Sequence, residues 1–445
     1  MTSKLFFLDA RRRPKFRPPL PYPETITPFE KMSVAALESL VAGSEPAKSD
    51  FMLRADFGAN ATAVQNDLTI LIQDMFPLYR YADERAKYYQ NEYYKFQWIL
   101  LIGSLVTSII GAMTIALSNA QSKDLGNLTD AQWLGIGSVM AGAVISIFTG
   151  RDRRRNSQSR WYLWRRVSEE LRRVYFMYLA HVSPFDGEDC RDILQAKLLD
   201  MRQSADKIEH NSPMDTSSTA ADQSASMATA KPGGQSFQWL HTKEELQRLL
   251  SLYVERRLKR QKDWYGERII EYEHNSSWVF DASLYLAVGT SVFAFINTLM
   301  GVTPLLSVII TLMPVVAAYI ASFERIYGWE RQATLYFSAR QRLEKHELTI
   351  QQRINDIKQG DWEVLRAVVR DVEDTFDDEV TQWGSKVDQT SRTPISSQEI
   401  ILDELKKLNL PPEQKKQIES ILGSEQQPSA PTTDENKTAD ENKQP

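Results

Sequence analysis

Uncharged apolar stretches long enough for four membrane crossings constrain this chain more than any other feature. Residues 96–122, 131–150 and 282–323 contain no Asp, Glu, Lys or Arg, and Gly301 and Pro304 interrupt the last stretch near its middle. A helix needs about 20 apolar residues to cross the hydrocarbon core of a bilayer. The sequence therefore predicts an all-α integral membrane protein with four transmembrane helices, at about 98–118, 130–149, 279–300 and 303–323.

The alternative is a soluble protein with two long buried hairpins. Buried helices of globular domains still carry a polar stripe. Residues 99–117 have only Gly, Ser and Thr among their apolar side chains, so they form no such polar stripe. The membrane interpretation is therefore favoured over the soluble one.

Basic residues predict how the spans are oriented. They are abundant just outside the hairpins, at 80–95, 151–166, 256–268 and 325–340, whereas Lys123 is the only one in the two segments that connect paired spans. Positive residues near span ends stay on the cytoplasmic side. We expect a multi-pass protein of the inner membrane with both termini cytoplasmic, and the first span, rather than a cleaved signal peptide, as the insertion signal. The single cysteine, Cys190, fits a reducing compartment.

The same layout occurs twice along the chain: a long polar helix, a hairpin of two spans, and a second long polar helix. This divides the sequence into a basic, Pro-rich N-terminal region with short helices, a first two-span unit, a disordered linker, a second two-span unit, and a small helical pair with a disordered tail. The corresponding ranges are 1–75, 76–205, 206–241, 242–385 and 386–445.

No pattern of residues predicts catalysis or a cofactor. The five histidines are scattered without metal-ligand spacing, and Gly135 and Gly137 lie inside an apolar span rather than after a strand. The acidic residues at 371–379 lack the glycine of a calcium loop, so they predict a solvated face or an ion-pair face between helices. We expect a protein that is not an enzyme, holds no cofactor or metal, and, with a net charge of -5, binds no nucleic acid.

Small residues recur every three or four positions in the first two spans. The candidates are Gly103, Thr107, Gly111, Gly135, Ser138, Gly142 and Ser146. Such spacing lets membrane helices pack closely, which is the favoured interpretation. The other is that these positions line a pore, and that requires a homo-oligomer because two hairpins enclose water poorly.

Arginines follow the second span directly, at Arg151, Arg153, Arg154 and Arg155. Basic residues at this position fix the topology, and each attracts anionic lipid headgroups by about 1 kcal/mol near the surface. We therefore expect the lipid bilayer as a partner of this segment.

Residues around each hairpin carry a resemblance to a known family. The first unit has Arg85 and Tyr88-Tyr89 before its hairpin, and Trp161, Arg165-Arg166 and Ser168-Glu169-Glu170-Leu171 after it. The second has Arg260 and Trp264-Tyr265 before, and 337–344 after. The chain resembles the SLATT/DUF4231 superfamily of bacterial two-span proteins. This resemblance implies a membrane effector that forms pores when a nucleotide-signalling partner triggers it, although this chain has two copies in tandem and no nucleotide-sensing domain of its own.

Two functions therefore stand as predictions. The first is an oligomeric pore-forming or channel-like effector of the inner membrane. The alternative is a membrane-anchored scaffold or sensor whose cytoplasmic helices recruit a protein partner.

Overall fold

The computed structural model of the chain describes residues 33–42, 50–120, 130–210, 242–300, 304–358 and 361–392. These residues are helical almost throughout and include no strand, which confirms the all-α prediction. The chain forms two compact units, Met1–Ser385 and Lys386–Pro445, and every contact reported below lies in the first. The Pro-rich start, most of the 206–241 linker and the predicted helical pair near the C-terminus lie outside the described residues.

The described residues of the first half form two short helices and then four longer ones, with a 3-10 turn and a π-helix between the early ones. They are α1 (Val34–Ala42), the 3-10 turn η5 (Arg54–Asp56), α2 (Thr62–Ile70), the π-helix η6 (Leu71–Met75), α3 (Phe76–Ala120), α4 (Asp130–Arg155), α5 (Ser157–Leu179) and α6 (Cys190–His210). The second half holds α8 (Lys243–Leu252), the π-helix η8 (Tyr253–Lys259), α9 (Arg260–Met300), α10 (Pro304–Tyr327), α11 (Trp329–Lys358) and α12 (Trp362–Arg392). A capping box between Thr242 and Glu245 starts α8.

The second span of each hairpin does not continue straight into the following helix. Asn156 separates α4 from α5 and Gly328 separates α10 from α11, and both have left-handed backbone angles, with φ of 48° and 57°. Glycine adopts this conformation without steric cost, and asparagine is one of the few other residues that visits it routinely. A single left-handed residue is enough to break a helix.

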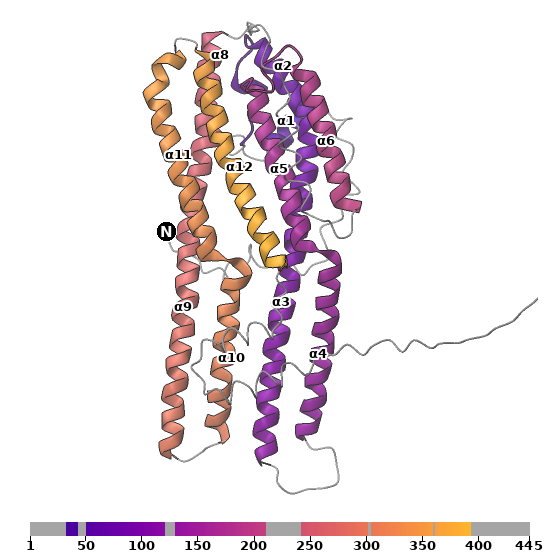
Figure 1. The fold of residues 1–445 in the computed structure, drawn as a ribbon, viewed down its shortest axis with the longest axis vertical. Coiled ribbons are helices and arrows are strands. Elements are labelled where there is room, and N and C mark those ends of the chain that lie inside the picture. Colours follow the sequence, from indigo (N-terminus) through magenta and orange to yellow (C-terminus); the bar gives the residue numbers. More distant parts are fainter. Residues whose placement is uncertain are drawn as a thin grey trace, which may run out of the picture. The chain divides into compact units, whose positions relative to one another are not determined.

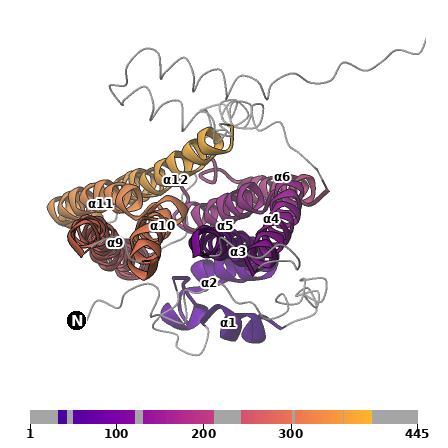
Figure 2. The ribbon, with the colours of Figure 1, turned by 90° about the horizontal axis from the view of Figure 1, so that it is seen from below.

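The helices of the two hairpins lie in the order α9, α10, α3, α4 (Figures 1 and 2). Contacts join α9 to α10, α10 to α3, and α3 to α4. Among these four helices the two halves of the chain therefore meet through α3 and α10. We call α1, α2, α5, α6, α8, α11 and α12, together with the parts of α3 and α9 that pack on them, the stalk region. The remaining parts of α3 and α9, with α4 and α10, are the span region.

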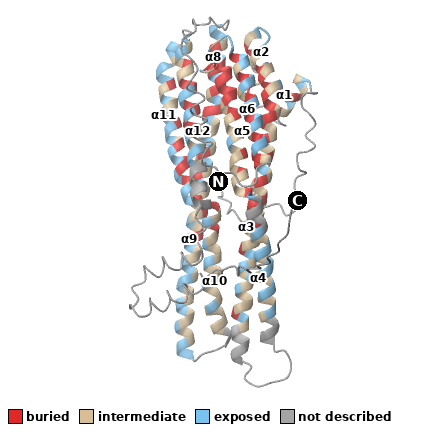
Figure 3. Cartoon of the chain, turned by 45° about the vertical axis from the view of Figure 1, so that its right-hand side comes forward, coloured by how far each residue is buried: buried red, intermediate tan, exposed pale blue. Residues whose placement is uncertain are grey.

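Buried residues are concentrated in the stalk region, whereas the span region is mostly exposed or intermediate (Figure 3). The stalk core includes Leu68 of α2, Trp164 of α5 and Leu343 of α11, and none of these three side chains is exposed. Three helical stretches, 62–114, 243–300 and 306–356, are long and apolar enough to cross a membrane, and a shorter apolar helix covers Gly135–Gly150. The span region thus has the surface of a protein built to face an apolar solvent.

Candidate functional site

The two halves of the chain repeat one structural unit. In each half the first long helical stretch carries a buried arginine, Arg85 or Arg257, and a left-handed residue, Asn156 or Gly328, precedes the helix that follows the hairpin. That helix packs on the first one through aromatic rings, Trp164 on Tyr81 and Tyr336 on Tyr265. The two halves therefore share their layout.

One detail adds to the sequence analysis, which named Arg260 in the second unit where the first has Arg85. The buried arginine of the second half is Arg257. Arg257 is 3% exposed and Arg85 is 2% exposed, whereas the side chain of Arg260 is 40% exposed and pairs with Asp50 at 3.0 Å. Three residues along a helix is less than one turn, so sequence spacing alone did not separate the two arginines.

Each repeat buries its arginine beside a tyrosine one turn earlier and a glutamate of a later helix. Arg85 donates to the Tyr81 hydroxyl at 3.1 Å and lies 3.5 Å from a Glu209 oxygen at the end of α6. In the second repeat Arg257 donates to both oxygens of Glu373 on α12, at 3.0 and 2.8 Å. These contacts tie the last helix of each repeat to its first.

The second of these pairs is fully enclosed. Glu373 is not exposed and also accepts a hydrogen bond from the Tyr253 hydroxyl at 3.1 Å. The Arg257 guanidinium lies over the rings of Phe376, at 4.2 Å, and Phe176, at 5.2 Å. Phe176 belongs to α5 of the first repeat, so the buried pair is part of the contact between the repeats.

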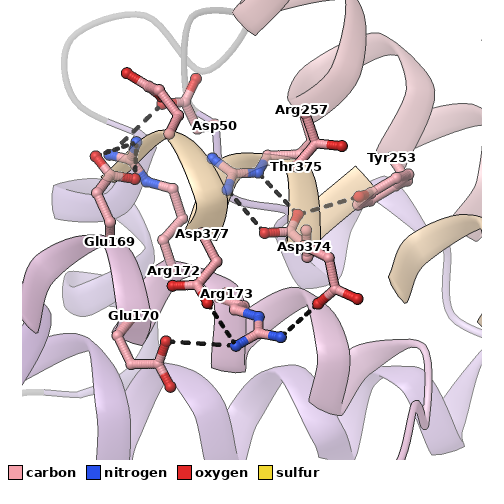
Figure 4. A network of polar contacts seen from close by, with 12 residues as sticks. Asp50, Glu169, Glu170, Arg172, Arg173, Tyr253, Arg257, Asp374, Thr375 and Asp377 are labelled. Carbon is pink, nitrogen blue, oxygen red and sulfur yellow. Dashed lines mark hydrogen bonds and ion pairs between the residues drawn. The ribbon is translucent and has the colours of Figure 1, made fainter. Parts of the chain in front are cut away.

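Figure 4 shows how α12 reaches the first repeat from this point. Arg173 of α5 donates to Asp374 at 2.6 Å and lies 3.6 Å from Asp377, both on α12. Its neighbour Arg172 pairs with Glu169 at 3.3 Å and with Asp50 at 3.9 Å. The acidic residues of α12 thus form ion pairs between helices, which is one of the two interpretations that their sequence left open.

Two carboxyl groups near this junction have displaced pKa values in opposite directions. Burial opposes ionisation of Glu169, but Arg165, Arg172 and Arg257 together outweigh it and lower its pKa to about 2. Burial raises the pKa of Glu379 on α12 to about 7, and the negative charge of Glu169 acts in the same direction. A hydrogen bond from Tyr265 and the charges of Arg165 and Arg257 lower this pKa, but they do not outweigh burial. The junction therefore holds one fixed negative charge and one group that titrates near neutral pH.

Aromatic side chains join the repeats where the stalk region meets the span region. Trp98 of α3 donates its Nε1 hydrogen to the Tyr327 hydroxyl of α10 at 2.8 Å, and Tyr94 stacks on Tyr327 with ring centroids 4.8 Å apart. Phe323 of α10 packs against Trp98, and Leu101 completes the cluster. Tyr and Trp favour this level of a membrane protein because each ring has an apolar body and a polar edge.

The small residues predicted for the spans lie in different surroundings. A Cβ atom on Gly103 would come within 2.8 Å of Ile145, so α3 and α4 approach closely there, whereas Gly111, Gly135 and Gly142 have no neighbouring atom of the described chain within 4 Å of that position. The hydroxyls of Thr107 and Ser146 donate to backbone carbonyls of their own helices, at 2.9 Å each, and Ser138 is half-buried. Whether these residues serve packing or a pore stays a prediction.

The second hairpin has a close approach that the sequence analysis did not single out. A Cβ atom on Gly289 of α9 would lie 2.6 Å from the end of Met313 on α10. Gly289 is the only glycine of its predicted span, so no repeated spacing of small residues marked it.

Arg151, Arg153, Arg154 and Arg155 occupy the last turns of α4, and their contact with lipid stays a prediction. Among the described residues, no group of three or more His, Cys, Asp or Glu is arranged to hold a metal ion.

Comparison with known families agrees with the two repeats. Residues 78–192 match a family described as a protein of unknown function, DUF4231, and residues 253–383 match one described as SMODS and SLOG-associating 2TM effector domain 1. The chain belongs to the SLATT/DUF4231 family. It carries two tandem domains of that family, as the sequence predicted, and together they cover more than half of it. No curated protein and no solved structure matches the chain.

Proposed function

We propose that this SLATT/DUF4231 protein is an effector that forms an oligomeric pore or channel in the inner membrane. In this proposal α3, α4, α9 and α10 all span the bilayer, at about 98–118, 130–149, 279–300 and 303–323, and the stalk region and both termini are cytoplasmic. The function involves no catalytic step and no cofactor. The second repeat's match to a two-span effector domain, on a chain with long apolar helices, suggests a membrane effector.

The observation that supports a pore is the exposure of the span region. Val139 is 73% exposed, Ile147 69%, Tyr285 74% and Phe295 64%. The helices of the two hairpins follow one another in the order α9, α10, α3, α4, and two hairpins enclose water poorly, so a water-filled path has to be formed by several copies. The exposed faces provide the surface for both lipid and neighbouring copies.

Leakage from liposomes tests this proposal. Purified protein reconstituted into liposomes should release ions and small dyes, and it should be an oligomer in the same detergent. Gly142→Trp should reduce the leak at least tenfold, because Gly142 lies on an open face where a bulky side chain would keep helices of neighbouring copies apart. Leu199→Trp, at an exposed position of the stalk helix α6, is the matched control and should leak like the wild type.

The alternative function is a membrane-anchored scaffold or sensor. It is favoured by the concentration of buried residues and ion pairs in the stalk region, where a protein partner would bind. Liposomes that stay sealed around a monomer would contradict the pore and support this alternative. An oligomer that leaks, with a leak that Gly142→Trp abolishes, would contradict the scaffold.

A further inference from the structure

An irregular segment near the start of the described chain is bonded to both repeats. Residues 50–56, which we call the strap, lie between α1 and α2 and contain the 3-10 turn η5. The Asp56 carboxylate closes this turn by accepting a hydrogen bond from the Leu53 amide at 2.7 Å. A short polar side chain that bonds to nearby backbone gives a segment a defined shape without a long helix or a strand.

Buried aromatic contacts fasten the strap to the first repeat. The Phe51 ring packs edge-on against Tyr79 of α3 and Tyr175 of α5, with ring centroids 4.9 Å from each. The Met52 side chain is not exposed, and the Tyr175 hydroxyl accepts from the Met52 amide at 3.0 Å and donates to the Met52 carbonyl at 3.1 Å. To detach here, the strap would have to expose this apolar surface to water, which is unfavourable. We call this contact the anchor.

Arginines of the second repeat hold the strap through polar contacts. They are Arg248 of α8, Arg256 of η8 and Arg260 of α9, which we call the clasp. Arg256 donates to the Phe51 carbonyl at 2.9 Å and pairs with Asp56 at 2.7 Å, and Arg248 donates to the Asp56 carbonyl at 3.0 Å. Arg260 pairs with Asp50 at 3.0 Å, and Asp50 also lies 3.9 Å from Arg172 of the first repeat (Figure 4).

Water reaches the clasp but not the anchor. Arg248 is exposed, and the side chains of Arg260 and Asp50 are 40% and 29% exposed, whereas Phe51 is 6% exposed. Ion pairs that water reaches contribute little to stability, and salt weakens them further. The strap is therefore held firmly on the first repeat and weakly on the second.

The strap supplements a sparse contact between the repeats. Among the described helices, extended contact across the repeats is made by α3 and α10. In the stalk region the repeats meet through individual side chains, such as Arg173 on Asp374 and Phe176 against Arg257. The strap adds backbone that is bonded to both repeats at this level, so its clasp can limit how they move relative to each other.

We propose that the strap is a releasable restraint between the two repeats, which stays anchored on α3 and α5 when the clasp opens. With the clasp closed, the second repeat is held at one separation from the first in the stalk region. With the clasp open, the repeats stay associated through α3 and α10 but sample a wider range of separations. This inference goes beyond the proposed function, because a restraint of this kind does not require that the protein conduct.

Distances between spin labels on the two repeats test the strap. Leu199 of α6 and Leu348 of α11 are exposed, and both are replaced by labelled cysteine in a full-length Cys190→Ser chain. Pulsed electron paramagnetic resonance should give a narrow distance distribution for this chain in detergent. Replacing all three clasp arginines by alanine should at least double the width of the distribution, and an unchanged width would overturn the proposal.

Salt tests the same restraint in a chain whose clasp is intact. Molar sodium chloride should widen the distribution of the labelled chain, because it screens the clasp. It should have little further effect on the variant without clasp arginines. No response in the labelled chain, or an equally large response in both chains, would contradict release at the clasp.

Two further variants separate the strap from a general loss of charge. Arg268→Ala, Arg340→Ala and Arg342→Ala together remove as many charges as the clasp variant, but these arginines pair within the second repeat. This control should keep the narrow distribution. Phe51→Ala weakens the anchor and leaves every clasp arginine in place, and it should widen the distribution as loss of the clasp does. Widening in the control, or a folded Phe51→Ala chain with the narrow distribution, would overturn the proposal.

Discussion

The two repeats are joined in different ways in the stalk region and in the span region. In the stalk region Arg173 of α5 pairs with Asp374 of α12, and the fully buried pair of Arg257 and Glu373 in the second repeat packs against Phe176 of the first. In the span region they meet through the aromatic cluster around Tyr327 and through apolar helix faces. Buried charges require a single geometry, whereas apolar faces tolerate several. The stalk region therefore fixes which repeat neighbours which, and the span region is the part that can change its packing.

The largest effect should follow from breaking the buried pair. Arg257→Met leaves the Glu373 carboxylate enclosed without its cation, and the cost of such a change is about 3–5 kcal/mol of unfolding free energy. Adding Glu373→Leu should recover much of that loss, because an apolar pair replaces two buried charges. Chemical unfolding of the three variants in detergent measures this, and losses that simply add would show that the two groups do not interact.

A smaller effect, dependent on pH, should follow from Glu379→Gln. The folded chain raises the pKa of Glu379 to about 7, which means that folding favours the protonated carboxyl. The stability that this protonation contributes is present at low pH and is lost as the pH rises to about 7. The substitution should raise the thermal midpoint at pH 8, by an amount equivalent to roughly 1–3 kcal/mol, and change little at pH 5. Glu344→Gln, on the exposed side of α11, is the control. Equal effects at both pH values would contradict the assignment.

The hydrogen bond of the aromatic cluster should contribute less. Trp98→Phe removes the donor to the Tyr327 hydroxyl and keeps an aromatic ring against Phe323, and it should cost about 1 kcal/mol. Tyr327→Phe in the same background should then have little further effect on this bond. Thermal unfolding of the two single variants and the double variant measures the coupling, and a coupling of zero would show that the bond does not join the repeats.

The smallest effect should come from an exposed pair that joins α11 to α12, the helix that also carries Glu373. Arg342 and Asp378 are 2.8 Å apart, but their side chains are 50% and 63% exposed. Arg342→Ala should cost less than about 1 kcal/mol, because water and salt screen the pair. A loss as large as that of Arg257→Met would contradict the view that burial, rather than ion pairing itself, makes the stalk junction strong.

The sequence predicted the layout because uncharged length is a strong signal. The apolar stretches indicated the long helices, and the order of polar and apolar helices indicated the repeat. It did not predict the breaks at Asn156 and Gly328, since a helix break of one residue leaves the apolar periodicity on either side intact. It also did not identify Glu373 as buried, because five other acidic residues surround it between 371 and 379 and only the fold shows which one faces Arg257.

Covalent fusion of the two repeats has a consequence for any assembly of this protein. Every copy brings both kinds of hairpin, so an assembly always contains them in equal numbers and in an even total. A substitution in one repeat then alters half of the hairpins and never all of them. Because the two hairpins are covalently linked, their effective concentration relative to each other is high, whereas hairpins on separate chains would meet at a rate that depends on how much protein the cell makes. Duplication therefore allows one repeat to diverge in sequence while the other preserves the original contacts.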